Sequence, residues 1–200
     1  MKKVLLETHF DIAIADNETL GRWHNAVVLS TAITHGDLRK PYTIEELVEE
    51  RTFFQKFDVK EQTQLGREIE GNTVQWWKSE RVTDEARKMS LFPDKERDTS
   101  IRTFVSSYES WAHRLGFEPT NTIHGDRNLF DVSKLQHIIE MTLGEKHHPW
   151  SYHDIIDITS FLKAWTGDRY GGIDIRKLEG AVYHDPRWDA AVDWYRMQQA

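Results

Sequence analysis

Two acidic residues, Asp16 and Glu18, lie two positions apart near the start of the chain. Apolar residues alternate along residues 10–15, which predicts a β-strand, and residues i and i+2 of a strand point to the same side. If the strand continues through Glu18, the two carboxylates share one space, where their charges repel. A divalent cation between them relieves that repulsion, and hard oxygen ligands suit Mg²⁺ or Mn²⁺. Two solvated acids at an exposed strand end are the equally supported alternative.

Two later acids stand where they could join this pair. Asp131 lies at a loop-to-helix junction, after a strand predicted over residues 120–124. Sites form at the carboxyl ends of strands in such sheets, so Asp131 can face Asp16; capping of the following helix is its alternative role. Asp157 lies among apolar residues. Because buried acids need partners, it either supports a site as a second-shell group or is simply exposed.

A histidine and an acid flank the start of the last predicted helix. Asp185 and Pro186 indicate an N-cap followed by proline at the first helical position. His184 lies just outside this helix, and Asp189 lies in about its first turn. A histidine on an entry loop beside an acid on a fixed helix can act as a general base next to a metal ligand. A surface or capping histidine is the alternative.

The composition indicates one ordinary soluble domain over residues 1–200, with a hydrophobic fraction of 38% and eight tryptophans to fill its core. The net charge of −7 argues against a wide basic surface for duplex DNA, although it leaves open a nuclease whose acids hold metal ions. The chain has no cysteine, which fits a reducing compartment. Its opening residues carry no secretory signal pattern, and no stretch is long and apolar enough for a membrane span. We therefore expect a cytoplasmic protein, in the host cytoplasm if it comes from a phage.

The order of hydrophobic patterns and turn residues predicts an α/β fold. Strands are expected over residues 10–18, 26–34, 51–57 and 120–124, with residues 152–165 as a helix or as a strand followed by a helix. Helices are expected over residues 72–78 with Asn72 as N-cap, 83–89, 100–115, 130–141, 174–179 and 185–197, and residues 58–71 are expected to be irregular. Residues 43–50 form a short helix with Thr43 and Glu46 as a capping box, or lead straight into the third strand. This order indicates a mixed sheet of about five strands, the first three antiparallel, flanked by helices on both faces.

The acids and the histidine, in this order, resemble the DEDDh branch of the DnaQ-like 3′–5′ exonucleases, which have an RNase H-like fold. The Asp-x-Glu motif of that family is matched by Asp16-Asn17-Glu18, followed by Thr19-Leu20-Gly21. Its second motif is matched by Phe130-Asp131. Its His-x₄-Asp motif is matched by His184 and Asp189.

The resemblance extends to phage exonuclease A (DexA) and its RNase T-like relatives. The segments similar to that group are residues 57–62, 73–77, 85–88 and 149–157, so the similarity covers nearly the whole chain. Three departures stand out. Asn17 is polar where the family usually has an apolar residue, residues 126–129 lack the expected glycine, and the segment around Asp157 has lost both arginines of its motif. We expect Asn17 to point away from the metals.

The resemblance implies a two-metal mechanism with two Mg²⁺ or Mn²⁺ ions, which stabilise the attacking and leaving oxygens of a phosphodiester. Asp16, Glu18, Asp131 and Asp189 would hold the metals, and His184 would accept the proton of the attacking water. The products would be nucleoside 5′-monophosphates. The residues expected to contact the substrate are Thr19, Leu20, Trp77, Phe130 and Tyr152, with core packing as the alternative role for Trp77 and its neighbour Trp76.

The resemblance favours one substrate and leaves two alternatives, a second substrate and a function without catalysis. The DexA-like middle segment favours single-stranded DNA 3′ ends. The RNase T-like relatives point instead to RNA 3′ ends. A catalytically silent nucleic-acid-binding module is the third reading, and the intact set of acids with His184 argues against it. Because RNase T-like enzymes are often dimers, a homodimer is a further expectation of the resemblance, and no membrane partner is expected.

Overall fold

The computed structural model describes residues 10–200, and the opening residues 1–9, where no secretory signal is expected, lie outside the described part. A mixed sheet with the strand order β4-β3-β2-β1-β5-β6 forms the centre of the fold. Its strands are β1 Asp11–Thr19, β2 Val28–Asp37, β3 Thr52–Phe57, β4 Asp98–Thr99, β5 Ile123–Asp126 and β6 Ile155–Asp157. The pairs β1–β2 and β2–β3 are antiparallel, and the other pairs are parallel. The predicted mixed sheet is confirmed, with the two-residue β4 as a sixth strand.

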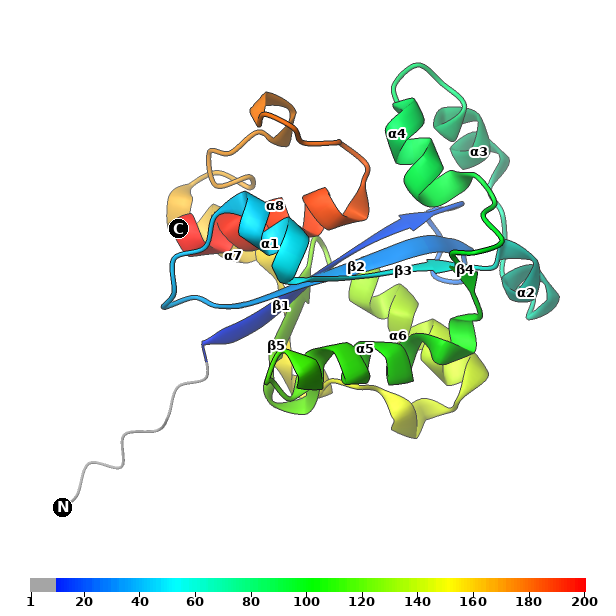
Figure 1. Cartoon of the computed structure of the whole chain (residues 1–200), viewed down its shortest axis with the longest axis horizontal. Coiled ribbons are helices and arrows are strands. Elements are labelled where there is room, and N and C mark those ends of the chain that lie inside the picture. The colour runs from blue at the N-terminus through cyan, green and yellow to red at the C-terminus, as the bar shows by residue number, and fades with distance from the viewer. Residues whose placement is uncertain (1–9) are drawn as a thin grey trace.

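Helices cover both faces of this sheet, as predicted (Figure 1). They are α1 Ile44–Glu50, α2 Val59–Gln64, α3 Gly71–Trp77, α4 Asp84–Ala86, α5 Phe104–Arg114, α6 Asp131–Thr142, α7 Ile158–Thr166 and α8 Pro186–Gln199. Helices α5 and α6 lie on one face, whereas α1, α7 and α8 lie on the other (Figure 1). Within residues 10–200, no helix is long and apolar enough to cross a membrane.

Strand β1 sends alternate side chains into two different cores. Ala13 and Ala15 belong to the core that includes α5 and α6, while Ile12 and Ile14 belong to the core that includes α8. Because side chains of a strand alternate, Asp16 and Glu18 continue the row of Ile12 and Ile14 toward α8. Asn17 continues the other row, toward α6. The sheet therefore separates Asn17 from the acids on either side of it in sequence.

Helix α8 is fixed against the sheet by one indole ring. Trp194 is fully buried, and its Nε1 donates a hydrogen bond of 3.0 Å to the Ile12 carbonyl oxygen of β1. The ring lies over Gly36 of β2, where the Cβ of any other residue would collide with it. The predicted N-cap Asp185 and first-turn Pro186 are confirmed at the start of this helix. These contacts determine where α8 places its acidic residues.

Some local predictions succeed and others fail for identifiable reasons. The capping box of Thr43 and Glu46 is present in α1, and residues 152–165 form a strand followed by a helix. The expectation of irregular chain over residues 58–71 is wrong, because α2 begins there after the N-cap Asp58. Its buried Gln62 pairs with both the N–H and the carbonyl of Val28, so polar composition concealed a tertiary contact.

The beginning of α3 also differs from the prediction. The N-cap residue is Glu70, not Asn72, and its carboxylate makes no capping bond. Instead it forms an ion pair of 2.8 Å with Arg22. The helix expected over residues 174–179 is a single 3₁₀ turn, Ile175–Lys177. Residues 83–89 are helical, but the short α4 continues as a π-helical turn over Arg87–Leu91.

Candidate active site

All the predicted metal-binding acids and the predicted base lie around one cavity of about 550 Å³. Asp16 and Glu18 come from β1, Asp131 from the first turn of α6, and Asp189 from the first turn of α8. His184 lies on the loop immediately before α8. These elements meet because the end of β1 runs between the N-termini of α6 and α8. The structure therefore brings together residues that are up to 173 positions apart, from Asp16 to Asp189.

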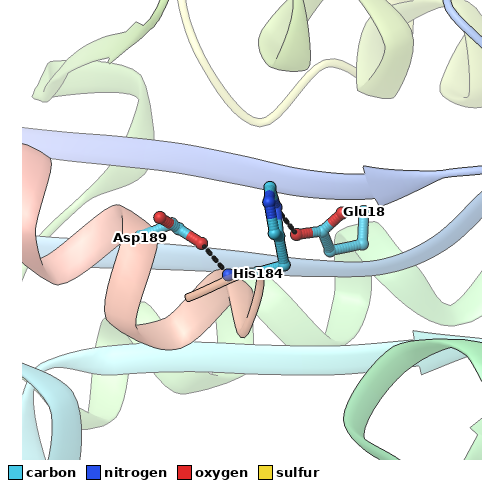
Figure 2. Close-up of side chains that lie close together, drawn as sticks. All are labelled: Glu18, His184 and Asp189. Atoms are coloured by element: carbon cyan, nitrogen blue, oxygen red, sulfur yellow. Dashed lines mark hydrogen bonds and ion pairs between the residues drawn. The ribbon is translucent and has the colours of Figure 1, made fainter. Parts of the chain in front are cut away.

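His184 lies between two of the acids (Figure 2). Its ring Nδ1 is 3.4 Å from Glu18 Oε1, and its main-chain N–H donates a hydrogen bond of 2.9 Å to Asp189 Oδ2. One ligand atom from each of these three residues lies within 4.8 Å of the others, as in groups that hold a metal ion. The backbone of His184 is left-handed, with a φ of 68°. Such a conformation is costly for a residue with a side chain and concentrates at functional sites.

Asp131 is held from the opposite face of β1. The main-chain N–H of Asn17 donates a hydrogen bond of 3.0 Å to Asp131 Oδ1, and the Asn17 side-chain amide donates one of 2.9 Å to the Asp131 carbonyl oxygen. Asn17 thus faces α6, away from the row formed by Asp16 and Glu18. Asn17, which is polar where the resembled family has an apolar residue, therefore positions Asp131, a predicted metal ligand.

The four carboxylates are electrostatically unfavourable when no cation is near. Burial raises the pKa of Asp16 well above its ordinary value, and repulsion from Asp189, Asp131 and Glu18 raises it further. Burial is also the main cause that raises the pKa values of Glu18, Asp131 and Asp189. Clustered acids with raised pKa values are typical of sites that bind cations or perform acid–base chemistry.

The environment of His184 favours its neutral form. Burial lowers its pKa, although the nearby Asp189 acts in the opposite direction. A neutral imidazole can accept a proton, which is what a general base needs. The edge-on ring of Trp76 lies 4.7 Å from the imidazole between ring centroids, at an interplanar angle of 88°. Trp76, which lies on α3, therefore packs against the ring of the candidate base His184.

The residues present fit divalent cations. Carboxylate oxygens from Asp16, Glu18, Asp131 and Asp189 are the hard ligands that Mg²⁺ and Mn²⁺ prefer. Two bound divalent cations would offset the repulsion that raises the carboxylate pKa values. Because ligands must be deprotonated to bind, metal binding at this site would release protons.

The loop before Asp131 adopts strained backbone where the resembled family carries glycine. Asn128 and Leu129 have φ values of 62° and 56°, in the left-handed region that glycine adopts without cost. The buried Asp126 offsets this strain by accepting a hydrogen bond from the Val132 N–H in the first turn of α6. Burial raises the pKa of Asp126 to about 6. Asp126 thereby fixes the turn that presents Asp131.

Comparison with known families identifies the chain. Residues 11–193 match the 3′–5′ exoribonuclease Rv2179c-like domain family. The chain belongs to this family. The family is described by a 3′–5′ exoribonuclease activity, and the fold is the RNase H-like fold that the DnaQ-like sequence motifs indicate. A search of curated proteins gives no match.

Solved structures of three nucleases share the fold of this chain. The zinc-bound complex of E. coli ExoI with single-stranded DNA superposes with a TM-score of 0.60 at 14% identity, over 94% of this chain and 40% of ExoI. The RNase domain of yeast Pop2 gives a TM-score of 0.55 at 8% identity, over 96% of this chain and 76% of that one. The cell-death related nuclease 4 (CRN-4) gives 0.56 at 14% identity, over 95% and 63%. The present chain spans about two fifths of the length of ExoI.

Only one of the predicted substrate-contacting residues lines the cavity, and it is Phe130. Trp77 is fully buried, and its Nε1 donates a hydrogen bond of 2.9 Å to the Thr19 carbonyl oxygen. Leu20 packs in the same core as Trp77. Tyr152 is 73% exposed, stacks on the neighbouring His153 and does not line the cavity. The alternative role of Trp77, core packing, is the one that the structure shows.

Asp157 has a structural role at a distance from the cavity. Its carboxylate caps α7 by accepting hydrogen bonds from the N–H groups of Thr159 and Ser160. It also accepts a hydrogen bond of 2.8 Å from the Asn128 N–H. Asp157 thus anchors the strained loop that leads to Asp131, although it does not itself line the cavity.

Sequence analysis missed a group of charged residues beside the acids. Asp193 is 4% exposed and forms ion pairs with Arg127 and Arg196. All three line the cavity, together with Tyr170. One signal was available, since Asp193 follows Asp189 by four positions and residues i and i+4 share a helix face. Arg127 gave no signal of its own, because its partner Asp193 lies 66 positions away in the sequence, whereas Arg196 pairs with Asp193 across one turn of α8.

Proposed function

We propose that this exonuclease removes nucleotides one at a time from the 3′ end of single-stranded RNA by a two-metal mechanism. The observation that carries the proposal is the convergence of Asp16, Glu18, Asp131, Asp189 and His184 on one cavity. Residues 1–200 would act as one exonuclease domain, since β1, α6, α8 and the loop before α8 together supply every member of this set.

Each residue of the site has a defined task in this proposal. Asp16, Glu18, Asp131 and Asp189 would hold two Mg²⁺ or Mn²⁺ ions, which would supply the positive charge that stabilises the reacting phosphodiester. His184 accepts the proton of the attacking water. We assign Nε2 as the accepting atom, because Nδ1 faces Glu18 Oε1. The water oxygen bonds to phosphorus, the bond from phosphorus to the 3′ oxygen breaks, and that oxygen takes up a proton from solvent. The products are a nucleoside 5′-monophosphate and a strand with a free 3′-hydroxyl.

RNA is the first choice of substrate because the family that includes this chain is described as exoribonuclease. DNA, which the sequence motifs favour, is the second choice, because structures with the same fold include ExoI bound to single-stranded DNA. The two substrates differ at the 2′-hydroxyl, which a protein can read by hydrogen bonding. A direct comparison of matched strands decides between them.

The test uses RNA and DNA oligonucleotides of the same sequence, labelled at the 5′ end, with Mg²⁺, Mn²⁺ or EDTA. We expect a ladder that shortens from the 3′ end with either metal, none with EDTA, and faster shortening of RNA. Chromatography should identify nucleoside 5′-monophosphates as products. Faster shortening of DNA would select the second candidate. Internal cuts, or intact strands of both kinds under every metal, would exclude both candidates.

A further inference from the structure

The loop of residues 168–173 follows α7 in the segment that leads to α8 (Figure 1). All of its residues except Gly171 line the cavity. It begins where the left-handed Gly167 ends α7, with a φ of 78°. The Asp168 carboxylate then accepts hydrogen bonds from the N–H groups of Tyr170 and Gly172, at 3.2 and 2.8 Å. These bonds close the loop into a compact turn, and the Asp168 carboxylate is engaged in forming them.

Two arginines fasten this loop to the rest of the site. Arg127 and Arg196 both bind the buried carboxylate of Asp193 on α8. Arg127 Nη1 also donates a hydrogen bond of 3.3 Å to the Arg169 carbonyl oxygen. Arg196 Nε donates one of 3.1 Å to the Ile173 carbonyl oxygen. The donors of Arg127 and Arg196 are therefore largely used in holding the 168–173 loop in place.

The same two arginines orient the Tyr170 ring. The guanidinium carbons of Arg127 and Arg196 lie 4.8 and 5.4 Å from the ring centroid, within the range of cation–π contacts. Arg169 contacts the ring as well, at 5.0 Å. Tyr170 is nevertheless 44% exposed, so part of the ring remains free for a ligand.

Arg169 differs from its neighbours in its lack of an acidic partner. Within residues 10–200, no ion pair or side-chain hydrogen bond engages its guanidinium, whereas Arg127, Arg176 and Arg196 are each paired with an aspartate. The side chain is exposed and lines the cavity. The 168–173 loop therefore presents one unpaired cation and one aromatic ring to a cavity that is also lined by the four predicted metal-binding carboxylates.

We propose that Arg169 and Tyr170 bind the substrate strand, with Arg169 on a backbone phosphate and the Tyr170 ring against a base. This assignment rests on the proposed function for its ligand, a single-stranded nucleic acid. A chain of net charge −7 whose site is lined by acids repels a polyanion, so binding requires local cations. Proteins that bind single strands combine such cations with aromatic rings on which bases stack. Asp193 is a positioning residue for this pair.

The test measures the affinity for a fluorescent single-stranded RNA by anisotropy at several salt concentrations. All variants carry Asp16→Asn, so that the strand stays intact in Mg²⁺. For Arg169→Gln, we expect the slope of log affinity against log salt to fall by about 0.7, the value for one phosphate contact on a single strand. For Tyr170→Ala, we expect affinity about 5- to 100-fold weaker with the slope unchanged. Tyr170→Phe should keep most of the affinity, because it retains the ring.

Lys163→Gln is the matched control, since Lys163 is an exposed cation of α7 that does not line the cavity. Its slope should equal that of the parent. An unchanged slope for Arg169→Gln, or an equal loss for Lys163→Gln, would overturn the proposal. Nuclease activity of the unmodified chain is measured separately. An active nuclease whose binding ignores Arg169 and Tyr170 refutes only this inference, whereas an inactive chain that still binds through them refutes only the proposed function.

Discussion

Asn17 holds Asp131 by two hydrogen bonds, one from its main chain to the carboxylate and one from its side chain to the carbonyl oxygen, at 3.0 and 2.9 Å. The pair joins β1 to the first turn of α6. One strand thereby serves the site from both of its faces, with Asp16 and Glu18 on the α8 side and Asn17 on the α6 side. The geometry of the acids therefore depends on a residue that carries no charge.

Replacing Asn17 with alanine tests this role. Loss of the side-chain bond leaves a buried carbonyl oxygen without its donor, which costs about 1–3 kcal/mol of unfolding free energy. We expect weaker Mg²⁺ binding and lower activity as well, because Asp131 loses one of its two constraints. Denaturant unfolding and calorimetric metal titration measure the two effects. Wild-type metal affinity in Asn17→Ala would show that the main-chain bond alone positions Asp131.

His184→Ala should lower the turnover rate by about 100-fold or more, the usual size of a lost general base. Metal binding should persist, since the four carboxylates remain. Single-turnover kinetics on a labelled oligonucleotide and Mn²⁺ calorimetry separate the two properties. His153→Ala is the control, because His153 is exposed beside Tyr152 and does not line the cavity. A collapse of metal affinity in His184→Ala would make His184 a ligand instead of a base.

Asp16→Asn should abolish detectable activity while stabilising the metal-free protein. The folded-state pKa of Asp16 lies well above its ordinary value of 3.8 because of burial and repulsion. A raised pKa means that the contribution of Asp16 to stability is fully present below pH 3.8 and is lost as the pH rises through the folded value. In EDTA, the stability advantage of the variant over the parent should therefore grow as the pH rises above 3.8.

Thermal unfolding over a pH series measures this difference directly. The same series with Mg²⁺ supplies a second check, since a ligand that binds only the folded state stabilises it by mass action. The parent should gain from Mg²⁺ and the variant should gain much less. Near-normal turnover in Asp16→Asn would remove Asp16 from the ligand set, and a stability difference independent of pH would contradict the raised pKa of Asp16.

Leu129→Gly should stabilise the protein by about 1 kcal/mol. The left-handed backbone at Leu129 costs a residue with a Cβ about 1–2 kcal/mol, and glycine avoids this cost. Glycine also loses more backbone entropy on folding, which cancels part of the gain. Leu129 has a φ of 56° and is 46% exposed, so its side chain contributes little packing. Leu143→Gly is the matched control, since Leu143 is also partly exposed but has a φ of −123°. That change should destabilise, and equal effects of the two in urea unfolding would contradict the strain argument.

The sequence predicts the elements of this fold where local signals and burial agree. The alternation before Asp16 and the Asp185-Pro186 start of α8 are both confirmed, and so is the DnaQ-like resemblance. Element bounds fail where tertiary contacts decide. Gln62 substitutes for a strand partner of Val28, which places a helix in a segment whose composition is typical of a loop.

Some residues of the candidate site could likewise be predicted from the sequence, and others could not. The sequence placed the acids and His184 at the boundaries of elements, and the structure brings these residues to one cavity; their roles stay predictions. Leu20 and Trp77 were expected to contact the substrate, but both are buried in one core, because the sequence does not reveal what their side chains pack against. Arg169 and Tyr170 were not predicted, because the 168–173 loop is held beside the cavity by hydrogen bonds from Arg127 and Arg196, which lie in distant segments of the chain.

Gly36 affects the distance between the sheet and α8. Because the Trp194 ring rests on it, the thickness of one indole sets the spacing between the sheet and α8. That spacing fixes the separation of the carboxylates on β1 from Asp189 on α8. Because even a Cβ at Gly36 collides with the Trp194 ring, a substitution there would push α8 away from the sheet and carry Asp189 away from Asp16 and Glu18.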